Sequence, residues 1–312
     1  MHRRSMLAGL ALAPLMARAE WVMSVVASFS ILADLTRQIA HSTQLAGAAQ
    51  TAASKGVGDA AVQVDALVGP DADVHQYEPT PSDMRVLMRA RLLVTNGLRL
   101  EGWMDRLTGA VRFNGITVVA AENVVPRTMK EEGGAVATDP HAWQDPRNAI
   151  LYVDAITKGL AAADPMNAAF YHESATRYAA RIAEADAWIT SRLASVPPDQ
   201  RRIITTHDAF GYYGARYSVE FLAPEGISTE FEPSAKSIAA LVAQIRKEKV
   251  RAVFIENMTS PRMARMLAQE TGAVLGGTVY SDALSPASGP AASYLDMLHH
   301  NTNLFAEAMR PR

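Results

Sequence analysis

Three histidines and one aspartate occupy loops beside apolar runs of the sequence, where they could together bind a metal ion: His75, His141, His207 and Asp282. His207 directly follows the segment RRIITT, residues 201–206, which we expect to be a strand. Asp282 follows the run 273–281 in the same way. Imidazole is a good ligand for zinc and related ions, and a carboxylate adds charge neutralisation. Three nitrogens and one oxygen complete a tetrahedron, so these residue types predict a site for a divalent transition metal.

Two of these histidines lie in loops that proline stiffens. His75 stands in VGPDADVHQYEPTPSD, residues 68–83, where three prolines disfavour helix. His141 stands in TDPHAWQDP, residues 138–146, another loop fixed by Asp and Pro. A ligand that is already held in place loses less conformational entropy on binding. A single loop histidine is more often simply solvated, so the metal-site interpretation depends on the shared placement near strand ends.

Composition excludes several classes of site. Of the 312 residues, 49% are hydrophobic and 20% are charged, which is typical of a globular protein large enough for two domains. The formal net charge of −2 gives no indication of a nucleic-acid partner. The chain contains no cysteine, which excludes disulfides, thiolate metal sites and a lipid-modified N-terminal cysteine.

The N-terminal residues have the features of a secretory signal peptide. Arg3 and Arg4 precede the apolar run 6–16, and the small-residue motif Ala17-Arg18-Ala19 follows. An apolar run of this length is too short to span a bilayer, which argues against the alternative of a membrane anchor. We expect cleavage after Ala19 and a mature protein in the periplasm. The paired arginines leave open whether export uses the general or the twin-arginine route.

The remaining sequence predicts an α/β fold with two lobes. Apolar runs alternate with amphipathic segments over 21–121 and again over 201–309, which is typical of mostly parallel sheets covered by helices. We therefore expect an N-terminal lobe at 20–163, one long rigid linking helix at 164–199 and a C-terminal lobe at 200–312. Each lobe supplies two candidate ligands, so the metal site is expected in the cleft between the lobes. Four serines precede predicted helices and are expected N-caps: Ser30, Ser234, Ser260 and Ser293.

Other polar residues allow more than one interpretation. Glu256 ends a predicted strand, and it is either a partner that orients a ligand imidazole or a cap of the next helix. Asp208 is expected to be a helix N-cap rather than a ligand. His299 and His300 are adjacent on the last predicted helix, so they point in different directions and are expected on a solvated face.

Two classes of function use such a site. A receptor for a transported metal and a zinc hydrolase both have histidine and carboxylate ligands. A catalytic zinc keeps an open position for water beside three protein ligands, whereas four protein ligands close the site. The four candidates therefore favour a binding protein over an enzyme. Three imidazoles to one carboxylate favour Zn²⁺, with Mn²⁺ as the alternative because it prefers harder oxygen ligands.

The mature chain resembles the zinc- and manganese-binding solute receptors of bacterial ABC importers, the cluster A-I or TroA-like family. The resemblance is carried by the stretches VVASFSILADL, LVGPDADVHQYEPTPSD, NGLRLEGWMDRL, DPHAWQDPRNAILYV, ITTHDAFGYYGARYSVEFLAPEGISTEFEPSA and GGTVYSDALS. It implies two α/β lobes, a rigid linking helix and one metal ion bound as cargo between the lobes. The implied partner is an ABC permease in the inner membrane, and the receptor is expected to be a monomer. By motif, the implied ligands are again His75, His141, His207 and Asp282.

Two segments depart from the family pattern. The expected loop before His141, residues 126–139, lacks the histidine cluster that many zinc receptors of this family carry there, which leaves Mn²⁺ open. The segment 41–59 is longer than the usual connection between a helix and a strand, and its residue pattern predicts only a loop.

Overall fold

The computed structural model describes residues 22–41, 62–130, 136–224, 226, 229 and 234–310. The expected signal peptide, 1–19, and nearly all of the 41–59 segment lie outside the described residues. Among the residues described, no helix combines the length and apolar character needed to cross a membrane.

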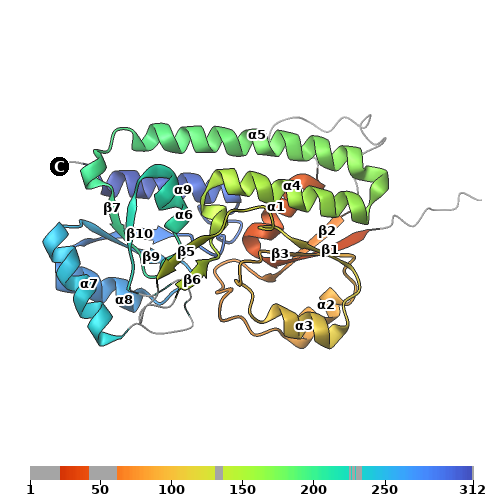
Figure 1. Cartoon of the computed structure of the whole chain (residues 1–312), viewed down its shortest axis with the longest axis horizontal. Coiled ribbons are helices and arrows are strands. Elements are labelled where there is room, and N and C mark those ends of the chain that lie inside the picture. Colours follow the sequence, from red (N-terminus) through yellow and green to blue (C-terminus); the bar gives the residue numbers. More distant parts are fainter. Residues whose placement is uncertain are drawn as a thin grey trace, which may run out of the picture.

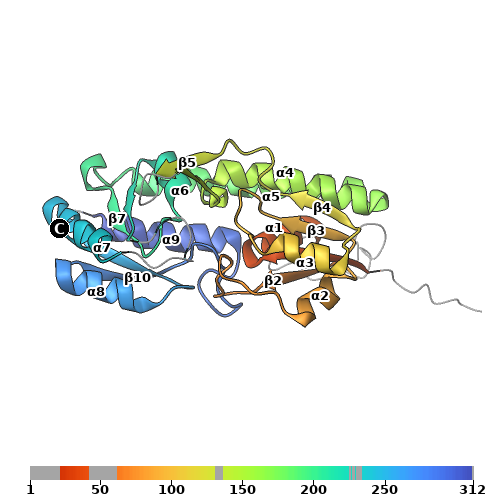
Figure 2. The same ribbon diagram turned by 60° about the horizontal axis from the view of Figure 1, so that its bottom comes forward.

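Two parallel four-stranded sheets lie at opposite ends of the molecule (Figures 1 and 2). The first has the order β2-β1-β3-β4, with β1 (Met23–Phe29), β2 (Val62–Val68), β3 (Leu92–Thr95) and β4 (Ile116–Val119). The second has the order β10-β9-β7-β8, with β7 (Arg202–Ile204), β8 (Glu220–Leu222), β9 (Ala252–Glu256) and β10 (Val274–Val279). All neighbouring strands in these two sheets run parallel, which confirms the predicted fold class.

The helices divide between the two sheets. The helices are α1 (Ser30–Ala40), α2 (Pro81–Leu87), α3 (Met104–Val111), α4 (Pro146–Ala163), α5 (Ala168–Leu193), α6 (Gly211–Tyr217), α7 (Ala235–Glu248), α8 (Pro261–Thr271) and α9 (Tyr294–Ala308), with short 3-10 turns η2 (Ala142–Gln144), η3 (Pro165–Asn167) and η4 (Pro198–Gln200). We call the first sheet with η2 and α1–α4 the N-terminal lobe, and the second sheet with α6–α9 the C-terminal lobe.

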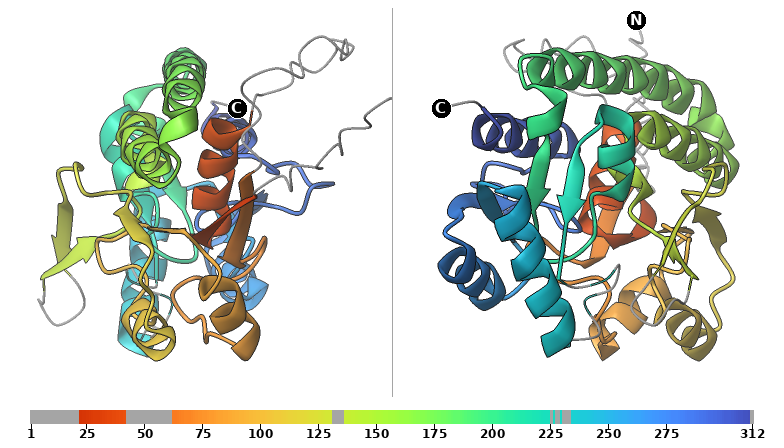
Figure 3. Two further views of the ribbon diagram at one scale, coloured as in Figure 1. Left: turned by 90° about the vertical axis from the view of Figure 1, so that its right-hand side faces the viewer. Right: turned by 60° about the vertical axis from the view of Figure 1, so that its left-hand side comes forward.

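The linking helix runs along both lobes. Of the expected range 164–199, α5 occupies Ala168–Leu193, with a 3-10 turn at each side. It packs against α1, α4 and α9, and Figures 1 and 3 show it beside α4 along one side of the molecule. On α5, Asp186 accepts hydrogen bonds from Arg216 (2.7 Å) and Tyr217 (2.7 Å) of α6. These contacts fix the helix to the C-terminal lobe as well as to the N-terminal lobe.

Three of the four expected serine caps are confirmed. The side chains of Ser234, Ser260 and Ser293 accept hydrogen bonds from backbone N–H groups in the first turns of α7, α8 and α9. The prediction for Ser30 is wrong, because Phe29 is the N-cap of α1. The Ser30 hydroxyl instead accepts a hydrogen bond from the backbone N–H of Leu284, a residue far along the chain.

A hairpin replaces the loop expected before His141. The strands β5 (Arg127–Lys130) and β6 (Val136–Asp139) pair antiparallel as a separate two-stranded sheet. Tyr212 of α6 connects this hairpin to the C-terminal lobe, because its hydroxyl accepts from the backbone N–H of Arg127 (2.9 Å) and donates to the carbonyl of Asp139 (3.2 Å). The polar strands lack the apolar alternation of a core strand, so the sequence pattern did not reveal them.

Two glycines in helices provide a matched test of the packing. A Cβ added to Gly159 of α4 would lie 2.2 Å from Val118 Cγ2 of β4, whereas a Cβ added to Gly109 of α3 would have no neighbour within 4 Å. We expect Gly159→Ala to lower the free energy of unfolding by about 1–3 kcal/mol through overpacking. Gly109→Ala is expected to raise it by up to about 1 kcal/mol through helix propensity. Urea unfolding followed by circular dichroism measures both, and equal stability of the two variants would contradict the packing.

Candidate metal centre

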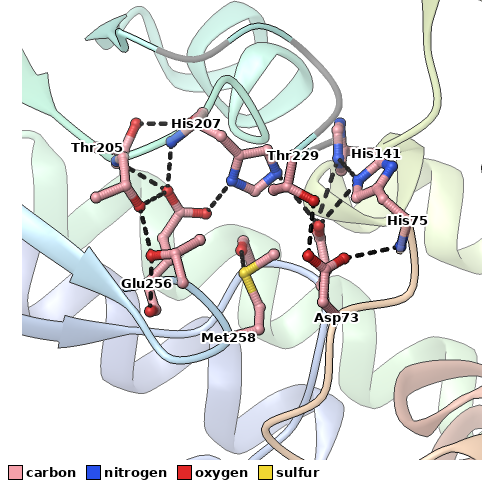
Figure 4. Close-up of polar contacts among 12 residues, drawn as sticks. Asp73, His75, His141, Thr205, His207, Thr229, Glu256 and Met258 are labelled. Carbon is pink, nitrogen blue, oxygen red and sulfur yellow. Dashed lines mark hydrogen bonds and ion pairs between the residues drawn. The ribbon is translucent and has the colours of Figure 1, made fainter. Parts of the chain in front are cut away.

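The four predicted residues come together between the lobes. The Nε2 atom of His75 lies 3.3 Å from Nε2 of His141 and 3.2 Å from Oδ2 of Asp282. The Nε2 atom of His207 lies 3.2 Å from the same carboxylate oxygen. One ligand atom from each side chain lies within 4.8 Å of all the others. Figure 4 shows the three imidazole rings converging from different segments of the chain.

The separations suit a small ion with few ligands. A tetrahedral ion with bonds of about 2.1 Å holds its ligand atoms about 3.4 Å apart. The printed separations of 3.2 and 3.3 Å lie close to that value, as does the 3.5 Å between His141 Nε2 and Asp282 Oδ1. The four side chains are therefore already arranged so that one ion could contact all of them.

The loop that carries His75 is held by its own side chains and by an indole. The Asp73 carboxylate accepts the backbone N–H of His75 at 2.8 Å. Trp103 Nε1 donates to the carbonyl of Val74 at 2.9 Å, and the ring of Tyr77 packs edge-on against Trp103. These bonds fix the backbone on either side of the imidazole, in agreement with the stiffness expected from the prolines.

His141 is oriented by a carboxylate that the sequence analysis did not single out. Asp139 Oδ1 lies 2.9 Å from His141 Nδ1 and also accepts the backbone N–H of His141 at 3.0 Å. Asn96, at the end of β3, donates to the carbonyl of Pro140 at 3.0 Å. A hydrogen bond at Nδ1 leaves Nε2 free to bind a metal. The spacing Asp-Pro-His was the available signal for this role.

His207 has a second carboxylate behind it. Glu256 Oε2 lies 2.6 Å from His207 Nδ1, and Oε1 accepts the backbone N–H groups of Thr206 and His207, both at 2.9 Å. Glu256 therefore orients the imidazole, and the alternative of a helix cap is excluded because Ser260 caps α8. The prediction that Asp208 is an N-cap is wrong, since α6 begins at Gly211.

The carboxylates change the protonation of the buried imidazoles. Burial alone would lower the pKa of His141, but Asp282 and Asp139 outweigh it and raise that pKa to about 9. Burial acts in the same direction on His207, and Glu256 and Asp282 nevertheless raise its pKa well above the usual value. The two imidazoles in turn hold the pKa of Asp282 well below its usual value, against the opposing effect of burial. The site therefore favours a bound cation, either protons or a metal ion.

The other histidines that the structure describes lie away from this cluster. His41 Nε2 contacts the carbonyl of Val62 at 2.8 Å. The ring of His299 packs edge-on against Trp188, and His300 contacts the carbonyl of Thr278 at 2.9 Å. The two residues expected on a solvated face of α9 are therefore partly buried and have partners.

Comparisons with known proteins agree on a class and differ on the metal. The family model described as "ZnuA: Zinc-uptake complex component A periplasmic" matches residues 25–308. Iron-binding protein YfeA of Yersinia pestis is 31% identical over 283 residues, covering 91% of this chain and 85% of that protein. Manganese-binding lipoprotein MntA of Bacillus subtilis (strain 168) is 28% identical over 284 residues, covering 89% of this chain and 91% of that protein. The structure of the periplasmic zinc-binding protein TroA from Treponema pallidum superposes with a TM-score of 0.82 at 26% identity, covering 93% of this chain and all of that one.

The contact between Glu256 and His207 predicts the effect of one substitution. Glu256→Gln keeps an oxygen for the two backbone N–H donors but removes the negative charge behind the imidazole. We expect the affinity for Zn²⁺ to fall about 10- to 100-fold, as is usual when the partner of a ligand histidine is lost. Competition with a chromogenic chelator measures the affinity. Glu173→Gln, on the exposed face of α5, is the control and should not differ from the unsubstituted protein.

Proposed function

The chain belongs to the family of periplasmic zinc-uptake components A, and from this premise we propose that it is a periplasmic receptor that captures Zn²⁺ for an ABC-type permease. The observation that carries the proposal is the convergence of His75, His141, His207 and Asp282 at separations of 3.2–3.5 Å inside the protein. In this proposal the four side chains are the ligands of the transported ion. The metal is cargo, bound and then released.

Zinc is proposed over manganese because of the donor set. Three imidazole nitrogens and one carboxylate are borderline-soft ligands, which suit Zn²⁺, whereas Mn²⁺ prefers oxygen donors and more of them. The Irving–Williams order also places Zn²⁺ above Mn²⁺ for a site of this kind. The names of the relatives include iron, manganese and zinc, so family membership alone leaves the cargo undecided.

The proposed site has the features of transport rather than catalysis. Four protein ligands close a tetrahedral zinc, whereas a catalytic zinc keeps a position for water. The side chains are also buried, with exposed fractions of 7% for His75 and 0% for His141, His207 and Asp282. A substrate therefore has no access to the bound ion, so we propose that the protein is not an enzyme.

The proposal includes the location and the division of the chain. We propose that the signal peptide is removed after Ala19 and that the mature receptor is a periplasmic monomer, without a nucleic-acid partner. Its lobes would be 20–163 and 200–312, joined by 164–199. The partner in this proposal is the permease of an ABC importer in the inner membrane.

One site made of four residues predicts one tightly bound metal ion per chain. Titration calorimetry of the metal-free protein with Zn²⁺ is expected to give a stoichiometry of one, and Zn²⁺ should displace Mn²⁺ in competition. Co²⁺ provides a test of geometry, because four-coordinate Co²⁺ absorbs visible light far more strongly than six-coordinate Co²⁺. Weak absorption together with preferential Mn²⁺ binding would overturn the choice of zinc.

Protons are expected to compete with the metal above neutral pH. His141 has a pKa of about 9 and the pKa of His207 is well above its usual value, so at pH 7 both rings hold a proton that must leave when metal binds. If two protons leave for each metal ion that binds, the apparent affinity should rise roughly a hundredfold for each unit of increase in pH between pH 6.5 and 8.

The slope of affinity against pH separates ligands from bystanders. The slope of the logarithm of affinity against pH gives the number of protons released per ion. His207→Ala should lower this number by about one, whereas His172→Ala, on the exposed face of α5, should leave it unchanged. Chelator competition across this pH range measures both. An affinity that does not vary with pH would contradict the assignment of these imidazoles as ligands.

A further inference from the structure

The candidate ligands are sealed inside the protein, so a bound ion can leave only when part of the site moves. The least buried of the four is His75, with 7% of its surface exposed. Which ligands move together depends on the segments that hold their backbones. His75 and His141 belong to the N-terminal lobe, and His207 follows β7 of the C-terminal lobe. In chain order Asp282 also belongs to the C-terminal lobe, since it follows β10.

The backbone just before Asp282 is bound by the N-terminal lobe. The carbonyl oxygen of Ser281 accepts two hydrogen bonds, from Trp143 Nε1 and from Gln144 Nε2, both at 2.9 Å. Trp143 and Gln144 lie in η2, which follows His141 directly, and both are buried. A pair of buried donors on one carbonyl oxygen resists separation, because moving away would leave polar groups without partners.

The backbone just after Asp282 is bound by the N-terminal lobe as well. Leu284 donates its N–H to the Ser30 hydroxyl on α1 at 3.0 Å, and its carbonyl accepts the N–H of Asp71 at 3.0 Å. Asp71 lies in the loop that carries His75. Both backbone groups of Leu284 therefore pair with residues next to the first sheet.

The start of α9 continues this attachment. Tyr294, the first residue of α9, donates its backbone N–H to the Asp34 carboxylate of α1 at 2.8 Å. Its hydroxyl donates to the carbonyl of Trp143 at 2.6 Å. Asp34 and Tyr294 are both buried. Figure 2 shows this end of α9 reaching α1, and the whole segment 281–294 is thus attached at several points.

The C-terminal lobe holds mainly the chain before this segment. The backbone of Tyr280 pairs with the side chain of Asn301 at 3.0 and 2.6 Å. The Ser281 hydroxyl lies 3.9 Å from the sulfur of Met258, which follows β9. After Asp282, the side chain of Asn257 donates a longer hydrogen bond of 3.3 Å to the carbonyl oxygen of Ala283. The change from one lobe to the other therefore falls at about residue 281, immediately before the ligand.

His207 is held differently. Its backbone N–H donates to Glu256 at the end of β9, its carbonyl accepts from the Thr205 hydroxyl at 3.0 Å, and its ring contacts Glu256 at 2.6 Å. Glu256 ends β9 and Thr205 directly follows β7, so these partners all lie in the C-terminal lobe. His207 and Glu256 are therefore expected to move as one unit with the second sheet.

On the basis of the proposed function, we propose that the metal centre is divided three to one, with His75, His141 and Asp282 fixed to the N-terminal lobe and His207 alone carried by the C-terminal sheet. Ser30, Asp34, Trp143 and Gln144 are the positioning residues of Asp282. When the lobes separate, His207 leaves first, and the ion stays on two imidazoles and one carboxylate. The departure of one ligand opens a coordination position, through which water or an acceptor group can take over the ion.

Distances between spin labels test this division directly. The chain has no cysteine, so pairs of introduced cysteines can be labelled without background. Three exposed positions mark the parts: Met88 at the end of α2, Ala287 in the segment after Asp282, and Gln269 on α8. The variants are Met88→Cys with Ala287→Cys, Met88→Cys with Gln269→Cys, and Ala287→Cys with Gln269→Cys. Pulsed electron paramagnetic resonance is recorded with Zn²⁺ bound and after chelation.

The three distances have distinct expected behaviour. On removal of Zn²⁺ the distance distribution between positions 88 and 287 should keep the position of its maximum. The maxima of both distributions that involve position 269 should shift. A shift between 88 and 287 with an unchanged distance between 287 and 269 would show that Asp282 moves with the C-terminal sheet, which overturns the division. Three unchanged distances would also overturn it, because His207 would then not leave.

Two further measurements separate the possible failures. Equilibrium dialysis of each labelled protein reports bound Zn²⁺; no binding would contradict the proposed function and this division with it, whereas binding with the wrong distance change contradicts the division alone. Hydrogen exchange of the unlabelled protein gives an independent readout. After chelation the amides of Leu284 and Tyr294 should keep their protection, because they donate to Ser30 and Asp34 of α1, which move with them. Loss of protection at both amides would contradict the division.

Discussion

Negative charge buried beside imidazole rings is the constraint on which the rest of the structure depends. Asp139, Asp282 and Glu256 are buried carboxylates that have lost nearly all contact with water. A buried charge is costly unless a partner and hydrogen bonds compensate it. Here the partners are His141 and His207, and the raised pKa values of both imidazoles show that the surroundings favour positive charge. A divalent ion held by the same side chains would supply the same compensation as the protons.

The scaffold limits how this cluster can open. The linking helix α5 packs on α1, α4 and α9 and is also fixed to α6 through Asp186. Large hinge motion would break these contacts together, so we expect the lobes to separate only by a small amount. In the candidate site, whose side-chain atoms lie 3.2–3.5 Å apart, a small displacement of one side chain would take it out of reach of a shared ion. A rigid scaffold and a releasable cargo are therefore compatible when one ligand stands apart from the other three.

The fold by itself does not select the metal. Relatives named for iron and manganese match this chain at 31% and 28% identity, and a protein named for zinc shares its architecture with a TM-score of 0.82. Selection must then come from the donor atoms and from what holds them. In this chain the candidate donors are three nitrogens and one carboxylate, and two of the imidazoles have a carboxylate against Nδ1. A carboxylate at Nδ1 increases the basicity of the opposite nitrogen, which strengthens the binding of a divalent metal.

The sequence by itself determined the fold class, the long helix and the four candidate ligands. Those properties depend on periodicity and on residue type near strand ends, which are local in the chain. The sequence did not determine the hairpin β5–β6, whose polar strands lack an apolar pattern, or the role of Ser30, which a local rule assigned to a helix cap. Only the tertiary structure decided between the two roles of Glu256, brought Asp139 to His141, and attached the segment of Asp282 to α1. Each of these depends on hydrogen bonds whose geometry is set by packing, and the bond between Leu284 and Ser30 joins residues 254 positions apart. No local pattern of residues encodes such a pairing, because it forms only when the whole chain has folded.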